Sequence, residues 1–100
     1  MVSDILRPGN KVEIKAVQKI ERQGSTGEVA HVYTSRIQEI HENGDIDISM
    51  PIEEGKYVLL HLGVRFEFVF YAEKNLYRAI GQVKAGYGYV IHCIKFLNAY

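Results

Sequence analysis

Four histidines and one cysteine are the side chains of this sequence best suited to metal binding or to nucleophilic chemistry. They are His31, His41, His61, His92 and Cys93. Zinc sites usually take their ligands at short, recurring spacings, and these residues show no such spacing. We expect His41 and His61 to lie in solvated turns, and His31 and His92 to lie on strand faces. The sequence therefore predicts no metal site and no histidine with a chemical role.

Cys93 would act as a nucleophile only if a nearby base or a helix N-terminus stabilised its thiolate. It lies between His92 and Ile94 in an apolar run. Adjacent residues on a strand point to opposite faces, so His92 does not activate it. We expect a buried, inert thiol and no catalytic residue.

Four carboxylates, Asp45, Asp47, Glu53 and Glu54, are candidates for an acid–base pair or a cation site. A calcium loop needs oxygen ligands at set positions, and apolar residues interrupt these acids. Asp45 and Asp47 are about 7 Å apart on one strand face. We expect that face to be solvated.

Two weaker patterns concern phosphate and nucleic acid. Gly86-Tyr87-Gly88 resembles part of a phosphate-binding loop, but no helix follows it, and we predict a hairpin turn. Tyrosines could stack on bases, as in oligonucleotide-binding barrels, or line the rim of an aromatic core. Twelve basic residues balance twelve acidic ones, which argues against nucleic acid. The tyrosines concerned are Tyr57, Tyr71, Tyr77, Tyr87, Tyr89 and Tyr100.

The stretch 45–56 organises the elements that would position these groups. Ile46, Ile48 and Met50 alternate with polar residues, which predicts a strand. Pro51 lacks an N–H and ends the ladder, and a glycine at position 55 allows a turn. Before this strand, Asn43-Gly44 predicts a type I′ hairpin that pairs it with the strand ending at position 40.

Further strands are predicted over 11–17, 28–40, 64–71, 76–84 and 89–96, with a short strand or extended link over 56–60. A change of phase in 28–40 predicts a bulge near Thr34-Ser35. Residues 22–27 are predicted to form a loop, and Gly81 to bend its strand. We expect Val64, Phe66, Phe68 and Phe70 to line one face of the core.

These elements predict an all-β domain over residues 1–100: a small antiparallel split β-barrel of six to seven strands, with at most a short helical turn near Ser3. One hundred residues suffice for one core. With a single cysteine, no disulfide can form within the chain. No apolar run approaches the roughly 20 residues of a membrane helix, and the N-terminus lacks a secretory signal. We expect a cytoplasmic protein that does not bind membranes.

The chain closely resembles the N-terminal domain of flagellar brake proteins of the YcgR type. The resemblance covers roughly residues 6–96. It rests first on a strand that opens with Pro8-Gly9-Asn10 and on an Ile- and Ser-rich strand that ends in Met50-Pro51-Ile52. Two glycines, Gly55 and Gly63, then flank an apolar run, and a hairpin with Leu76-Tyr77-Arg78 follows.

The resemblance implies a split barrel that precedes a PilZ domain, the domain that binds the bacterial messenger cyclic di-GMP. In the family, the liganded protein engages the flagellar motor and slows swimming. The PilZ ligand signature, Arg-x-x-x-Arg with an Asp/Asn-x-Ser-x-x-Gly strand, does not occur here, where the arginines are isolated. We therefore assign no cyclic di-GMP ligands and no cofactor to this chain, and we expect the PilZ domain to lie outside residues 1–100. The arginines are Arg7, Arg22, Arg36, Arg65 and Arg78.

The first hypothesis is thus a non-catalytic regulatory domain that contacts a PilZ domain, with flagellar motor proteins as further partners and cyclic di-GMP involved indirectly. The second is a flavin-binding split barrel, by analogy of fold alone, which a yellow protein would support. The third is a barrel that binds single-stranded nucleic acid, which salt-sensitive oligonucleotide binding would support.

Overall fold

The computed structural model describes residues 5–22, 25–87 and 91–99. A turn capped by Ser3 therefore lies outside the described residues. The strands are β1 (Lys11–Arg22), β2 (Ser25–Ile40), β3 (Ile46–Ser49), β4 (Ile52–Glu53), β5 (Lys56–Tyr57), β6 (Arg65–Ala72), β7 (Asn75–Tyr87) and β8 (Ile91–Ala99).

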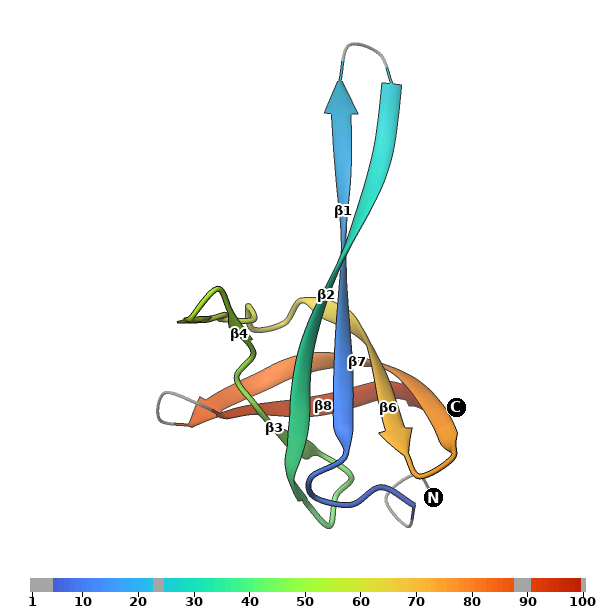
Figure 1. Cartoon of the computed structure of the whole chain (residues 1–100), viewed down its shortest axis with the longest axis vertical. Helices are drawn as coiled ribbons and strands as arrows, with labels where there is room; N and C mark the ends of the chain where they lie inside the picture. Colours follow the sequence, from blue (N-terminus) through green and yellow to red (C-terminus); the bar gives the residue numbers. More distant parts are fainter. Residues whose placement is uncertain (1–4, 23–24, 88–90, 100) are drawn as a thin grey trace.

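Six of these strands form a closed antiparallel barrel in the order β1-β2-β3-β8-β7-β6, which closes where β6 pairs with β1 (Figure 1). Strands β4 and β5 form a separate two-stranded sheet at one side. The prediction of an all-β antiparallel barrel is confirmed, and the described residues contain no helix. Within the described part of the chain, nothing is therefore helical, long and apolar enough to cross a membrane.

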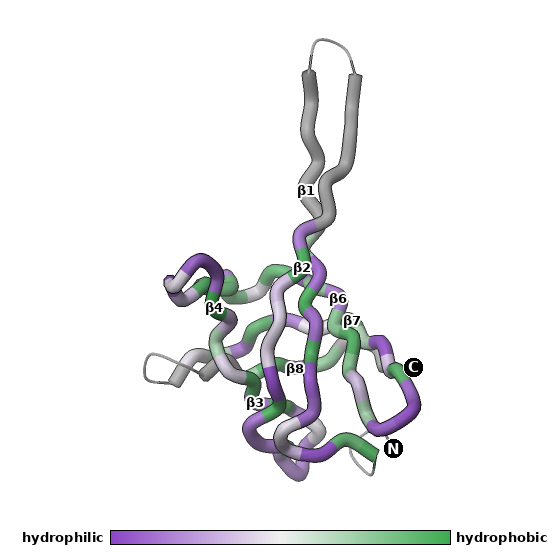
Figure 2. Tube along the Cα trace, in the orientation of Figure 1, coloured by the Kyte–Doolittle hydropathy of each residue, from purple (hydrophilic) through white to green (hydrophobic). Residues whose placement is uncertain are grey.

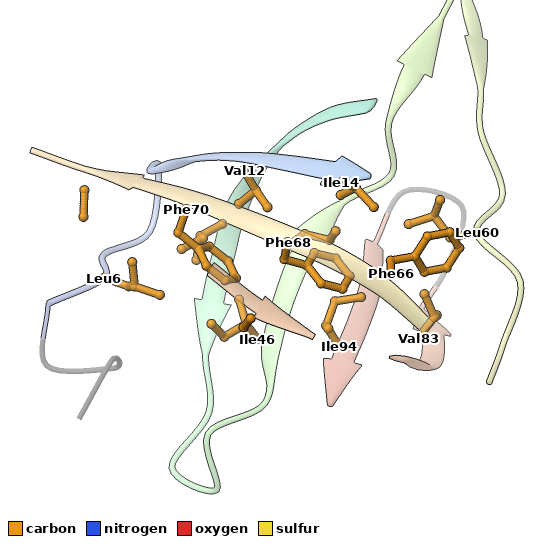
Figure 3. Close-up of a cluster of buried hydrophobic side chains, with 14 residues drawn as sticks. Leu6, Val12, Ile14, Ile46, Leu60, Phe66, Phe68, Phe70, Val83 and Ile94 are labelled. Carbon is orange, nitrogen blue, oxygen red and sulfur yellow. The ribbon is translucent and has the colours of Figure 1, made fainter. Parts of the chain in front are cut away.

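Phenylalanines from β6 fill the barrel. Phe66, Phe68 and Phe70 all point inward, as predicted, and pack with apolar side chains from every other barrel strand (Figure 3). The ring of Phe96 on β8 meets those of Phe68 and Phe70 edge-on, with centroids 5.6 Å and 5.5 Å away. Val64, expected on this face, is instead exposed because it precedes the strand.

The first two strands extend well beyond the barrel (Figure 1). β6 pairs only with residues Lys11 to Lys15 of β1, whereas β1 and β2 stay paired out to Arg22 and Ser25. The loop predicted over 22–27 is wrong for residues 22 and 25–27, which belong to the ladder; residues 23–24 lie outside the described residues. Backbone pairing along the hairpin outweighs the turn propensity of Gly27.

Strand β2 changes phase as predicted, but at a different place. Its register shifts between Ile37 and Glu39, not at Thr34-Ser35. Ile37 is buried before the shift and Ile40 packs against the core after it. The small polar residue at position 35 does not mark the bulge: its hydroxyl is buried and donates to the carbonyl of Ser49 at 2.5 Å.

The connection between β2 and β3 is a hairpin, as predicted, but its turn is not of type I′. That type needs positive φ at both central residues, and here Gly44 has a φ of 93° while Asn43 does not have a positive φ. The Gly44 N–H donates to the carbonyl of His41 at 3.0 Å, as in a type I turn followed by a glycine bulge. The two-residue turn with positive φ at both positions is Glu54-Gly55, between β4 and β5.

Strand β7 bends at Gly81, as predicted, where the register against β8 shifts. A Cβ there would lie 2.9 Å from Ile94 and 3.0 Å from the ring of Phe68, so the glycine permits a close approach of two walls. The hairpin turn predicted at 86–88 is wrong for Gly86 and Tyr87, which pair with β8. Gly88 lies outside the described residues.

Candidate functional site

Five large apolar side chains are exposed along the segment between β3 and β6, where hydrophobic and hydrophilic stretches follow one another (Figure 2). We call them the apolar rim: Ile52, Tyr57, Leu59, Leu62 and Val64, each 45% to 66% exposed. The first two are cross-strand partners on β4 and β5. Soluble domains rarely expose apolar groups so densely over one short segment unless the surface meets a partner.

The segment that carries the apolar rim is anchored to the barrel. Leu60 is buried between two exposed leucines, and the Val58 N–H donates to the Pro51 carbonyl at 2.8 Å. The Gly63 N–H donates to the Val83 carbonyl at 3.1 Å, and the Gln82 amide donates to the Gly63 carbonyl at 3.0 Å. These bonds explain how a segment with little regular structure holds its apolar side chains outward.

Two of the predicted histidine positions border the apolar rim. His61 is exposed in the loop between Leu60 and Leu62, as expected, and helps to line a surface pocket there with Gly86 of β7. His31 lies exposed on β2, also as expected, and its Nε2 is 3.0 Å from Oε2 of Glu53 on β4. This contact joins the long hairpin to the small sheet, while Glu54 remains exposed in the turn.

A second group of polar residues lies on the outer face of β3, and there the prediction of a solvated face is wrong. Asp45 and Asp47 are only 7% and 6% exposed. Ile46 and Ile48 point to the opposite face, into the core, as predicted. We call Asp45, Asp47, His41, Lys84 and Cys93 the outer cluster. Alternation along the strand correctly predicted which residues share a face. It could not predict that neighbouring strands and side chains cover the outer face as well as the inner one.

Asp45 is held by two donors. Its Oδ2 accepts a hydrogen bond from Lys84 Nζ at 2.5 Å and another from Asn43 Nδ2 at 3.1 Å. Burial by itself would raise the pKa of this carboxyl, but the bonds from Lys84 and Asn43 outweigh it and hold the pKa below its usual range. Asp45 is therefore an ionised, paired carboxylate at neutral pH.

His41, Asp47 and Cys93 come together although they are distant in sequence. Asp47 and Cys93 are direct partners across β3 and β8, and the hairpin turn returns His41 to the same place. His41 lies at the start of the hairpin turn, as expected, but it is not fully solvated: its side chain is half-buried, with its Nε2 3.0 Å from Oδ2 of Asp47. That carboxylate raises the pKa of His41.

Cys93 is buried, as predicted, but it lies outside the barrel core cluster. Burial, together with a hydrogen bond to Asp47 and the charges of Asp47 and Asp45, raises the pKa of its thiol to about 11. The thiol is thus protonated at neutral pH and a poor nucleophile. The described geometry gives no activated nucleophile at this position.

The remaining candidate residues serve the barrel wall. The Tyr71 hydroxyl donates to the Glu13 carboxylate, which raises the pKa of the tyrosine, and Lys11 lies 4.9 Å from the centre of its ring. Tyr77 packs against the core. The side chains of Tyr87 and His92, and all of Tyr89 and Tyr100, lie outside the described residues.

Comparison with known proteins gives one match. The family model for the flagellar protein YcgR, PilZNR, matches residues 7–94. This chain belongs to the YcgR family. No curated protein and no solved structure matches it.

The match places this chain in a regulatory family associated with cyclic di-GMP and flagella. Its matched residues include the apolar rim and all five residues of the outer cluster. In the YcgR-type segment, Pro51 is buried beside β3, Gly55 forms the turn between β4 and β5, and Gly63 anchors the segment to β7. The family pattern thus follows the path of the segment that exposes the apolar rim.

Proposed function

We propose that this chain is a non-catalytic regulatory domain that acts with a PilZ domain, which carries the cyclic di-GMP site, in the control of flagellar motility. The observation that carries the proposal is the match to the YcgR family over residues 7–94. Its cellular setting is the cytoplasm, and flagellar motor proteins are partners of the complete, liganded assembly rather than of this barrel alone.

The apolar rim is the surface that supports a docking role. Leu59 and Leu62 are its most exposed residues, and Tyr57 is an aromatic group of the kind enriched at interfaces. Exposed Glu53, Glu54 and Lys56 border it. An apolar centre with a charged border is the usual composition of a protein–protein interface. The PilZ domain of a YcgR protein is the occupant we assign to it.

Among the side chains that the structure describes, none forms a comparable site inside the barrel. Side chains of the core cluster fill it, as expected for a barrel of this size. We therefore expect cyclic di-GMP to change the contact between this barrel and the PilZ domain while binding to the latter.

Calorimetric titration of this chain with a YcgR PilZ domain, with and without cyclic di-GMP, tests the proposal. We expect measurable binding that depends on the messenger, and loss of most of it in Leu59→Ser combined with Leu62→Ser. Leu76→Ser is the matched control, because Leu76 is an equally exposed leucine on β7, outside the apolar rim.

Two results would overturn the proposal. One is tight binding of cyclic di-GMP to this chain in the absence of the PilZ domain. The other is a loss of PilZ-domain binding in Leu76→Ser that is as large as the loss in the double variant Leu59→Ser, Leu62→Ser.

A further inference from the structure

We propose that His41, Asp47 and Cys93 form a binding site for a zinc-class divalent cation on the outer face of the barrel. One nitrogen, one oxygen and one sulphur ligand atom from these residues all lie within 4.8 Å of one another. This inference is independent of the regulatory role proposed above.

The backbone brings the three ligands together from three places. Asp47 on β3 lies opposite Cys93 on β8, and residues at such positions point to the same face of the sheet. His41 follows β2 and is held by its N–H, which donates to the Asp45 carbonyl at 2.9 Å. Zinc binds nitrogen, oxygen and sulphur at about 2.0 to 2.3 Å in tetrahedral geometry. Small side-chain rotations would bring the three atoms to those distances and leave a fourth position for water.

Two buried polar atoms of the cluster lack a hydrogen bond within the described part of the chain. Nε2 of His41 and Oδ1 of Asp47 are both buried, and neither has a hydrogen-bond partner among the described residues, although Nε2 lies 3.0 Å from the other carboxylate oxygen. Buried polar atoms normally have partners, because leaving one unsatisfied is costly. A bound cation would satisfy both atoms at once.

The charges also balance. Zinc carries two positive charges, the Asp47 carboxylate one negative charge, and the Cys93 thiolate another. Binding requires the thiol to lose its proton to solvent, so that the S–H bond breaks as the metal–sulphur bond forms. Among the other charged groups near the cluster, Asp45 and Glu39 favour a bound cation, whereas Lys84 opposes it. The charge of Lys84 is offset by its hydrogen bond to the Asp45 carboxylate.

Cobalt(II) is the most direct probe, because a thiolate ligand gives a charge-transfer band and tetrahedral coordination gives strong visible bands. The reduced, chelator-treated chain is titrated with cobalt and then with zinc. We expect both sets of bands to appear with cobalt and to disappear when zinc displaces it. At a pH above the pKa of His41, we also expect each metal ion to release one proton on binding, which calorimetry in buffers of different ionisation enthalpy measures.

Single substitutions test whether each of the three residues is a metal ligand. Cys93→Ser removes the charge-transfer band, and His41→Gln and Asp47→Asn each weaken binding by at least roughly 10- to 100-fold, the range known for changes in outer-shell partners of a metal. His61→Gln is the matched control, because it makes the same change at an exposed histidine outside the cluster. It leaves the affinity unchanged.

Cys93 is the only cysteine of the chain, so its alkylation provides a second readout on the unaltered protein. Zinc slows alkylation of the native chain if the site exists, whether or not the variants fold. Absence of a charge-transfer band with the native chain, persistence of that band in Cys93→Ser, or alkylation that zinc does not slow would each overturn the proposal.

Discussion

Both faces of strand β3 are buried, the inner face among apolar side chains and the outer face among polar ones. On the inner face, Ile46 and Ile48 are buried in the apolar core of the barrel. On the outer face, Asp47 and the preceding Asp45 lie among His41, Lys84 and Cys93. Few strands bury charged residues so completely on the side that faces away from the core.

The difference shows that alternation along a strand and exposure to solvent are separate properties. Apolar side chains on the inner face are stabilised by removal of their surface from water. Carboxylates on the outer face are tolerated because cations and donors compensate for their burial. The two faces should therefore respond differently to substitution and to pH, and the predictions below test that contrast from the largest effect to the smallest.

The strongest test places a charge on the inner face. We expect Ile48→Asp to abolish folding, because Ile48 is fully buried and an unpaired buried charge costs several kcal/mol, comparable to the roughly 5–15 kcal/mol of total stability. Circular dichroism and urea denaturation measure the loss. Ile52→Asp is the control, since Ile52 is exposed on β4 and the variant should fold normally. A cooperatively folded Ile48→Asp variant would show that the assignment of faces is wrong.

Overpacking the inner face should have the next largest effect. Gly81→Ala would place a Cβ 2.9 Å from Ile94, 3.0 Å from Phe68 and 3.2 Å from the carbonyl of Lys95. We expect a loss of about 1–3 kcal/mol in the free energy of unfolding, as for other overpacked cores. Arg78→Ala, at an exposed position on the same strand, should change it by less than about 0.5 kcal/mol. Equal stability of the Gly81→Ala variant and the native chain would contradict the close packing of β7 on β8.

On the outer face, Asp45→Asn should cost about 1.5–3 kcal/mol at neutral pH, the range for hydrogen bonds to charged groups. The pKa of Asp45 is lower in the folded chain than its usual value, so its contribution is complete above the usual pKa of about 3.9 and is lost as the pH falls through the folded value. Urea denaturation at several pH values should show a smaller acid dependence in the variant. Glu42→Gln, at an exposed position of the same turn, should keep the native acid dependence.

The smallest effect is expected at His41. The pKa of His41 is raised by Asp47, so protonation stabilises the fold below the usual histidine pKa of about 6.5, and this contribution disappears as the pH rises through the folded value. The difference in stability between the native chain and His41→Gln should therefore shrink from mildly acidic to alkaline pH in metal-free buffer. His61→Gln is the control, because His61 is exposed and lies outside the cluster, and an identical trend in that variant would contradict the assignment.

Much of the fold could be predicted because its signals are local. The alternation in 45–50, the phenylalanines at every second position of β6 and the bend at Gly81 each depend on residues within one or two strands. The length of the β1–β2 hairpin and the type of the turn between β2 and β3 could not be predicted in this way. They depend on pairing with a partner strand, which overrides the turn propensity of Gly27 and of Asn43-Gly44.

Little of the outer cluster could be predicted. Asp47 is near His41 in sequence, and the hairpin signal was enough to place His41 in the turn that leads into the strand of Asp47. Nothing in the sequence indicated that β8 would add itself to the other edge of β3 and bring Cys93 opposite Asp47. A rule based on ligand spacing along the chain fails when the third ligand comes from a strand more than forty residues away.

By itself, the sequence determined the all-β class, the inward set of Ile46, Ile48 and the β6 phenylalanines, and the YcgR-type pattern from Pro8 to Arg78, because each follows from short-range alternation and turn chemistry. Only the tertiary structure decided that Asp45 and Asp47 are buried and that three candidate ligands from β3, β8 and the turn meet. Burial depends on what lies above a face, and barrel closure, a long-range event, sets which strands become neighbours.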